Sequence, residues 1–320
     1  MNNNLLPYCH RDTENTEKNL LVQNTVLIIL ISLFFSLQLG AKEHLEKHNL
    51  IIVFSEKDST FAHRLLNKFY TIKSELNRKV GYYPTIKTVL ILSETSREYN
   101  EIADKFNVNN KETRGFAVPS RNLIILKNPC DLQSLDEFYQ VFRHEYLHLM
   151  LQDASVNSHI PLWFAEGFTQ YFSGEWNFIK EYRFVKNILT GKAINLKLYE
   201  YHYPKYKHQN ELFYQESYYA MKLLIDKYSI QRLQVFLENF QKYNSFSQAF
   251  TNTFQISPTN FIIQLETSMN RHSWLMVVYS GLSAVWIIMP LLLLIAYIRK
   301  KIKAKRIVMQ WENEASFYNL

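Results

Sequence analysis

The chain has 320 residues, enough for one or two globular domains and too many for a small protein held together by disulfide bonds. With 2 Cys, 7 Gly and 8 Pro, it has neither a disulfide framework nor a low-complexity composition, which excludes cysteine-rich and disordered proteins. The net charge of +7 is concentrated after Ile298, so it does not indicate nucleic-acid binding, and no feature indicates a nucleotide cofactor.

The N-terminal 41 residues contain a short apolar run over residues 25–37, followed by the small residues Gly40 and Ala41. The 13-residue length of the run is typical of a cleaved signal peptide, whereas the long acidic segment before it favours an uncleaved signal anchor. We therefore expect residues 1–41 to be a tail followed by one of these two export segments.

The body of the protein, residues 42–273, divides into an α/β part over 42–134 and a helical part over 135–273. Short apolar runs and helical spacing define the elements of the first part. They predict strands over 50–54, 88–92, 115–118 and 123–126, and helices over 60–79 and 96–106. The last two strands are close enough in sequence to form a hairpin. The pattern predicts an α+β fold with a small mixed sheet.

His144, Glu145 and His148 form an H-E-x-x-H motif within a segment that is apolar nearly all round. Residues i and i+4 of a helix lie on one face, so both imidazoles can bind a single ion, and Glu145 can reach a water beside it. Burying each histidine without a partner would cost about 1 to 3 kcal/mol, and a metal ion supplies that partner. The alternative is a pair of core histidines that other protein groups satisfy.

Glu166 is the single carboxylate of a second apolar segment, residues 161–172. A buried carboxylate is expected to be neutral, paired or bound to a metal ion. A metzincin would need Gly and His where Leu151 and Ala154 stand, and the polar Arg143 argues against an intramembrane protease. Two His and one Glu with an open fourth position is the composition of a catalytic zinc site.

An aromatic stretch follows over residues 199–208, and two interpretations of it stay open. It can line a specificity surface, or it can be a solvated loop.

Residues 274–298 carry no charge, and 25 residues at 1.5 Å each exceed a hydrocarbon core of about 30 Å. This predicts a C-terminal transmembrane helix, with a buried core helix as the alternative. Six of the 22 residues in the tail 299–320 are Lys or Arg, which predicts that the tail is cytoplasmic and the body extracytoplasmic. We therefore expect an integral protein of the cell membrane.

The motif HEYLH and the downstream segment IPLWFAEGFTQYF resemble those of gluzincin metallopeptidases, in particular the peptidase MA-like family, with a more distant likeness to aminopeptidase-N-like enzymes. The resemblance implies a thermolysin-like catalytic domain in which His144, His148 and Glu166 bind one zinc ion and Glu145 is the general base. Only 17 residues separate His148 from Glu166, one fewer than is usual in the aminopeptidases. Their exopeptidase specificity is therefore not carried over.

The resemblance implies two further roles. Gly115, Phe116, Ala117 and Val118 correspond to the strand that binds extended substrate at the rim of the cleft, although they can also simply complete the sheet. Tyr214 corresponds to a tyrosine that stabilises the oxyanion, although a packing role stays open.

We expect, in sum, a membrane-anchored zinc metallopeptidase that hydrolyses a peptide or protein substrate by a zinc-activated water with Glu145 as general base. One alternative is a catalytically silent, membrane-anchored interaction domain that retains the gluzincin fold. Another is a structural envelope protein whose histidines bind no metal. The sequence does not indicate an oligomeric state.

Overall fold

The computed structural model describes residues 42–55, 58–108, 113–128, 134–155 and 158–318, and in the last helix it describes side chains for 258–276, 278 and 289–309. The predicted signal segment over 25–37 lies outside these residues. The strands are β1 (Lys42–Lys47), β2 (Leu50–Ser55), β3 (Thr88–Leu92), β4 (Gly115–Val118) and β5 (Leu123–Leu126). The helices are α2 (Ser59–Val80), α3 (Ser96–Lys105), α4 (Leu135–Ser155), α5 (Leu162–Ser173), α6 (Phe178–Leu189), α7 (Lys207–Tyr228), α8 (Ile230–Tyr243), α9 (Phe246–Phe254) and α10 (Pro258–Tyr318), with short 3-10 turns η2 (Pro119–Arg121) and η4 (Leu196–Tyr199).

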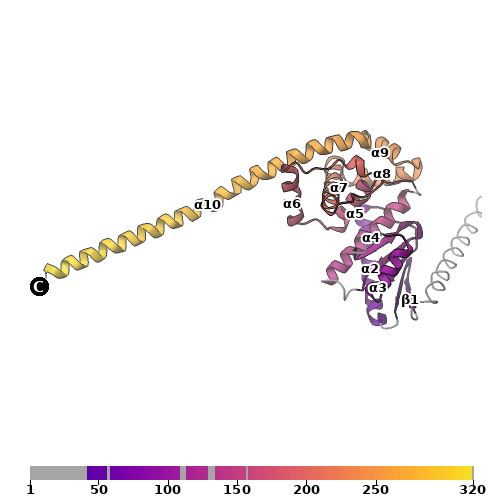
Figure 1. The fold of residues 1–320 in the computed structure, drawn as a ribbon, viewed down its shortest axis with the longest axis horizontal. Helices are drawn as coiled ribbons and strands as arrows, with labels where there is room; N and C mark the ends of the chain where they lie inside the picture. Colours follow the sequence, from indigo (N-terminus) through magenta and orange to yellow (C-terminus); the bar gives the residue numbers. More distant parts are fainter. Residues whose placement is uncertain (1–41, 56–57, 109–112, 129–133, 156–157, 319–320) are drawn as a thin grey trace, which may run out of the picture.

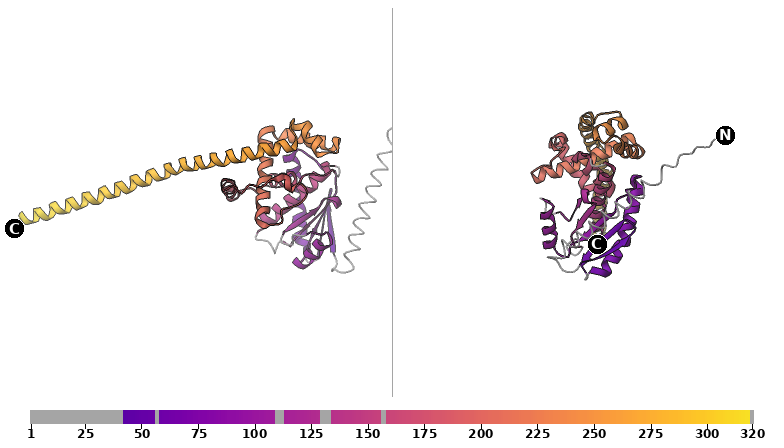
Figure 2. Two further views of the ribbon diagram at one scale, coloured as in Figure 1. Left: turned by 45° about the horizontal axis from the view of Figure 1, so that its top comes forward. Right: turned by 90° about the vertical axis from the view of Figure 1, so that its right-hand side faces the viewer.

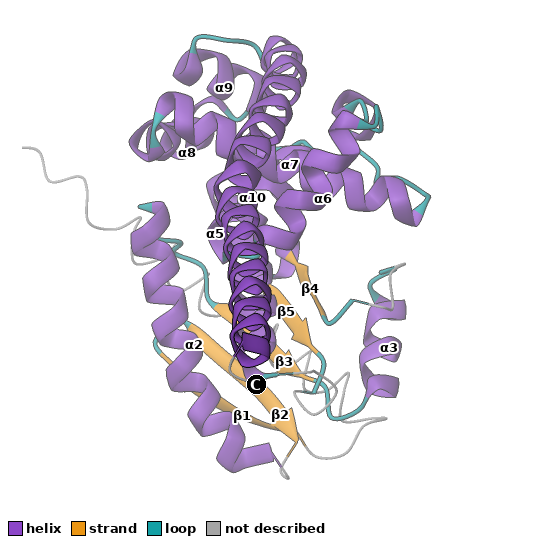
Figure 3. Ribbon diagram, turned by 90° about the vertical axis from the view of Figure 1, so that its left-hand side faces the viewer, coloured by secondary structure: helices purple, strands orange, loops and turns teal. Residues whose placement is uncertain are grey.

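The strands form one mixed sheet in the order β1-β2-β3-β5-β4. The three central strands run parallel, and β1 and β4 pair antiparallel at the two edges. The central strands are apolar except for Ser55 at the end of β2 and Thr88 at the start of β3, because helices cover both of their faces. Helix α2 packs against one face and α3 against the other, as Figure 3 shows.

Helix α4 joins the sheet to the helical part of the molecule. It contacts β4, β5 and α2 on one side and α5 and α8 on the other, so it is apolar nearly all round, as expected for a buried helix. Figure 1 and Figure 2 show α4 between the sheet and the cluster of helices from α5 onward. Helix α10 begins against this cluster and then extends away from it.

Helices α5 and α7 pack with unusually close backbones at Gly167. A Cβ atom on this residue would lie 2.2 Å from the carbonyl oxygen of Ser217, so only glycine fits. The contact fixes the part of α5 that carries Glu166 against the part of α7 that carries Tyr214.

The α+β fold predicted from the sequence is confirmed, with a small mixed sheet followed by helices. The structure adds strand β1, which the sequence did not predict. Its residues KEHLEK carry charges at four of six positions, whereas strand prediction depends on apolar and β-branched residues. Pairing with β2, rather than intrinsic preference, makes this segment a strand.

The prediction of a transmembrane helix over residues 274–298 is wrong. Among the residues that the structure describes, no helix has both the length and the apolar character that a membrane crossing requires. The cell-membrane location and the predicted sidedness of the body and tail depended on that helix and are corrected with it.

Replacing Gly167 by Ala should destabilise the protein. Alanine favours a helix over glycine by about 1 kcal/mol, but its Cβ collides with backbone that cannot rotate away, and such overpacking costs about 1 to 3 kcal/mol. Urea unfolding of the Gly167→Ala protein should show a lower free energy of unfolding. A variant that is as stable as the original, or more stable, would contradict the close α5–α7 contact.

Candidate metal centre

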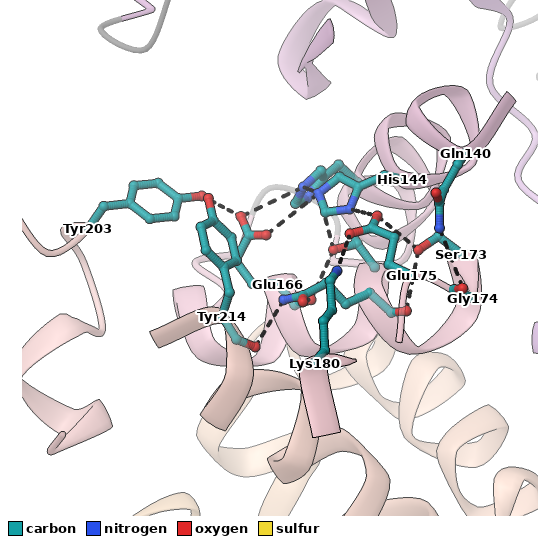
Figure 4. A network of polar contacts seen from close by, with 12 residues as sticks. Gln140, His144, Glu166, Ser173, Gly174, Glu175, Lys180, Tyr203 and Tyr214 are labelled. Atoms are coloured by element: carbon teal, nitrogen blue, oxygen red, sulfur yellow. Dashed lines mark hydrogen bonds and ion pairs between the residues drawn. The ribbon is translucent and has the colours of Figure 1, made fainter. Parts of the chain in front are cut away.

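His144, His148 and Glu166 come together at the contact between α4 and α5. Their candidate ligand atoms all lie within 4.8 Å of one another. The Nε2 atoms of the two histidines are 3.2 Å apart, and the Glu166 carboxylate lies 3.6 Å from the Nε2 of His144 and 3.8 Å from that of His148. Figure 4 shows the Glu166 carboxylate directed toward the imidazoles. The spacing i, i+4 places both rings on one face of α4, and α5 crosses that face with Glu166.

The exposure of these groups suits a site that solvent reaches from one side. The side chain of Glu166 is 3% exposed, whereas His144 and His148 keep 17% and 20% of theirs exposed. The Tyr203 hydroxyl donates a 2.5 Å hydrogen bond to Oε1 of Glu166. The other oxygen, Oε2, is buried and has no hydrogen-bond partner among the described residues.

An unpaired carboxylate oxygen at this depth is costly, because a buried polar group needs a partner. A divalent cation between Oε2 and the two imidazole nitrogens supplies that partner. The residues therefore fit a metal ion held by two nitrogens and one oxygen, and the donor set is one that zinc accepts.

Glu175 orients His144 from the side opposite the candidate ion. Its Oε1 lies 2.6 Å from Nδ1 of His144, and it also accepts a hydrogen bond from Ser173 and pairs with Lys180 at 3.7 Å. An ionised carboxylate only accepts hydrogen bonds, so Nδ1 carries a proton, and a metal ion would bind at Nε2 in place of a second proton. Figure 4 shows this network.

Burial and neighbouring charges shift the pKa values in this cluster. Burial alone lowers the pKa of His144, but Glu175 and Glu166 outweigh it and raise that pKa well above its ordinary value. Burial lowers the pKa of His148 to about 4, so this imidazole is neutral at pH 7. Burial opposes ionisation of Glu175, yet the charge of His144 and its hydrogen bond lower the pKa of Glu175 to about 2. Burial also opposes ionisation of Glu166, but its interactions with His144 and His148 outweigh burial and lower its pKa.

Glu145 lines the same cavity as the three candidate ligands. Burial raises the pKa of its carboxyl to about 7, although the nearby His144 and a hydrogen bond from the backbone N–H of Ala117 counteract part of the shift. A carboxyl group with a pKa near neutrality can both accept and donate a proton at pH 7.

The free edge of β4 faces this cavity. The backbone carbonyl of Arg114 accepts a hydrogen bond from the N–H of Lys127 on the β5 side. By the alternation of an antiparallel pair, the backbone N–H and carbonyl groups of residues 114, 116 and 118 point toward β5, and those of Gly115 and Ala117 point away from it. The hydrogen bond from Ala117 to Glu145 agrees with this alternation. Of the four predicted strand residues, Gly115 and Ala117 thus present backbone groups to the cavity, whereas the backbone groups of Phe116 and Val118 point toward β5. Phe116 and Ala117 also line the cavity wall.

Gly115 allows β4 to lie directly on α4. A Cβ atom there would be 2.6 Å from the side chain of Leu126 and 2.7 Å from that of Val141. Without that atom, the strand edge can approach the helix that carries the motif.

Two tyrosines approach Glu166 from the helical part. Tyr203 donates to Glu166 from the segment before α7, and Tyr214 lies on α7 with its ring centroid 6.3 Å from that of Tyr203. Burial and the Glu166 charge raise the pKa values of both phenols, which therefore stay protonated. Tyr214 lines the cavity beside the candidate ligands, as its predicted role requires.

The sequence did not single out Glu175 or a role for Tyr203. Glu175 follows Gly174, whose left-handed backbone (φ +79°) ends α5 and turns the chain back toward His144, and no motif marks that turn. Tyr203 belongs to the aromatic stretch for which two interpretations were open. Within that stretch, Tyr201, His202 and Tyr203 line the cavity.

The comparison with known families agrees with this arrangement. A family model described as Peptidase MA superfamily matches residues 84–263, which are 180 of the 320 residues. The chain therefore belongs to the peptidase MA superfamily, whose members are typically metal-dependent. The match begins before β3 and ends within α10, so it includes the whole candidate site. No curated protein matches the chain.

Replacing Glu175 by Gln should weaken metal binding without removing a ligand. The neutral amide no longer holds the Nδ1 proton of His144 against a charge, and loss of such a partner typically costs about 10- to 100-fold in affinity. Competition between the protein and a chelator for Zn²⁺ measures the effect. Glu211→Gln, which alters an exposed carboxylate paired with Arg183, is the control and should leave the affinity unchanged. Equal affinities for the two variants would show that Glu175 does not orient the ligand.

Proposed function

We propose that the protein is a zinc metallopeptidase of the gluzincin type, in which His144, His148 and Glu166 hold one zinc ion. The observation that carries the proposal is the convergence of these three side chains, with a buried Glu166 oxygen that has no hydrogen-bond partner among the described residues. Membership of the peptidase MA superfamily supports it. A bound zinc ion supplies Lewis-acid activation of water and of the substrate carbonyl.

Glu145 acts as the general base. It is not one of the three groups that converge on the ion, yet it lines the same cavity, and its raised pKa suits proton transfer near neutral pH. The carboxylate takes a proton from the attacking water and returns it to the amine that leaves when the peptide C–N bond breaks.

The edge of β4 binds the substrate backbone. An extended peptide can pair, as an added strand, with the carbonyl and N–H of Gly115 and the carbonyl of Ala117, which are directed toward the cavity, while the N–H of Ala117 donates to Glu145. Pairing of this kind places a substrate carbonyl beside Glu145, because Ala117 itself donates to Glu145.

The two tyrosines have different roles in this proposal. Tyr214 donates a hydrogen bond to the oxyanion that forms on the substrate carbonyl, since it lines the cavity as a protonated phenol. Tyr203 holds Oε1 of Glu166 and so leaves Oε2 directed toward the metal ion.

Glu145→Gln and His148→Ala should separate metal binding from turnover. The Gln variant keeps all three proposed ligands, so it should retain zinc but lose about 10²- to 10⁴-fold in kcat. The Ala variant lacks one ligand and should lose the metal itself. Elemental analysis of the purified proteins and hydrolysis of a quenched fluorescent peptide, with and without a chelator, measure the two properties.

A Gln variant that cleaves the peptide normally would contradict the role of Glu145. A wild-type protein that binds zinc but cleaves no peptide would instead favour the catalytically silent interaction domain. A wild-type protein without zinc would refute the metal site.

Tyr214→Phe and Tyr203→Phe remove one hydroxyl each and should affect different properties, turnover in the first and zinc binding in the second. The first should lower kcat by about 10²- to 10³-fold, because one oxyanion donor is lost, while zinc affinity stays the same. The second should lower zinc affinity by about 10- to 100-fold, because a group that orients a ligand is lost. Steady-state kinetics at saturating zinc and chelator competition distinguish the two. Unchanged kcat in Tyr214→Phe would assign that tyrosine to packing.

A further inference from the structure

Two cavities extend from the candidate site in different directions. We define the 202-side arm as the cavity of about 880 Å³ that continues past Pro119, His202, Lys205 and Asn210. We define the 175-side arm as the cavity of about 490 Å³ that continues past Glu137, Gln140, Trp176 and Lys180.

The two arms meet at the site itself. Thr113, Gly115, His144 and Glu145 line both of them, so the strand edge and the proposed general base lie where one arm passes into the other. A polypeptide paired with Gly115 and Ala117 therefore has room on both sides of the bond that faces Glu145.

The charged groups that the structure describes in the two arms do not form a site for a free chain end. An exopeptidase needs an unpaired carboxylate for an α-amine, or an unpaired cation for an α-carboxylate, at a fixed distance from the reacting bond. In the 175-side arm, Glu137 pairs with Arg114, and Glu175 pairs with His144 and Lys180.

The 202-side arm has no carboxylate among its described lining residues other than Glu145 and Glu166, which belong to the proposed catalytic centre. Its basic side chains, Lys205 and His202, are exposed rather than enclosed. Among the described lining residues, neither arm thus offers an unpaired carboxylate for an amino terminus, and neither encloses a cation for a carboxyl terminus.

We infer that the protein is an endopeptidase that binds an extended internal segment of a polypeptide through both arms and recognises neither terminus. The inference rests on the proposed peptidase function. Each cleavage adds one water across an internal C–N bond and leaves a new carboxylate on one product and a new amine on the other.

Peptides with blocked ends test the inference. The full-length protein with Zn²⁺ is incubated with mixed-sequence peptides of about 14 residues, which exceed 40 Å when extended and so can occupy both arms. Each peptide is supplied with free ends, N-acetylated, C-amidated or blocked at both ends, and the products are identified by mass spectrometry. Glu145→Gln is the control for contaminating proteases.

We expect cleavage at internal bonds, with kcat/KM for the doubly blocked peptides within about threefold of that for the free peptides. Release of one or two residues from a free end, together with a loss of about 100-fold or more on blocking that end, would overturn the inference and leave the peptidase function intact. Failure to cleave any form would refute the peptidase function and the inference with it.

A bulkier residue in one arm provides a second test. Gln140 lines the 175-side arm one helical turn before His144, and Gln140→Trp should narrow that arm without altering a proposed ligand. We expect kcat/KM for the long, doubly blocked peptides to fall about tenfold, with little change for short peptides that do not reach the arm. Tyr182→Trp, at an exposed position of α6 outside both arms, is the control. Equal effects on long and short peptides would contradict a substrate that passes through both arms.

Discussion

The burial of three polar side chains at the contact between α4 and α5 is the constraint on which the rest of the site depends. Helices this apolar pack well without polar groups, and each buried imidazole or carboxylate costs free energy unless it has a partner. His144 is held by Glu175, and Glu166 is held by Tyr203. These partners fix the direction of the remaining lone pairs, which point at a common position. A cation at that position completes the set.

Two close backbone contacts maintain this geometry. Gly115 lets the edge of β4 rest on α4, and Gly167 lets α5 rest on α7. The first contact brings β4, the strand that we propose binds substrate, beside Glu145, and the second brings Tyr214 toward Glu166. The edge of β4 therefore forms one wall of the cavity and the helices form the other, with His144, His148 and Glu166 between them.

The parts of the site that the sequence predicts are those determined by local geometry. His144, Glu145 and His148 lie within five residues of one helix, so helical periodicity places them, and Glu166 is the only carboxylate of its apolar segment. Glu175 and Tyr203 depend on how irregular segments fold back onto α4 and α5, which periodicity does not describe. Strand β1 depends on pairing with β2. The transmembrane prediction used the length and the uncharged, apolar character of residues 274–298, whereas no helix of the described part of the chain combines the length and apolar character that a membrane crossing requires.

The two edges of the sheet differ in chemistry. Strand β1 carries Lys42, Glu43, Glu46 and Lys47 along six residues, and such charges prevent one sheet from pairing with the edge of another. Strand β4, at the opposite edge, has no charged residue. An extended chain that meets this protein therefore finds one edge that repels it and one that accepts it. The charges on β1 thus disfavour self-association through that edge, while the uncharged edge of β4 is the one that we propose pairs with substrate.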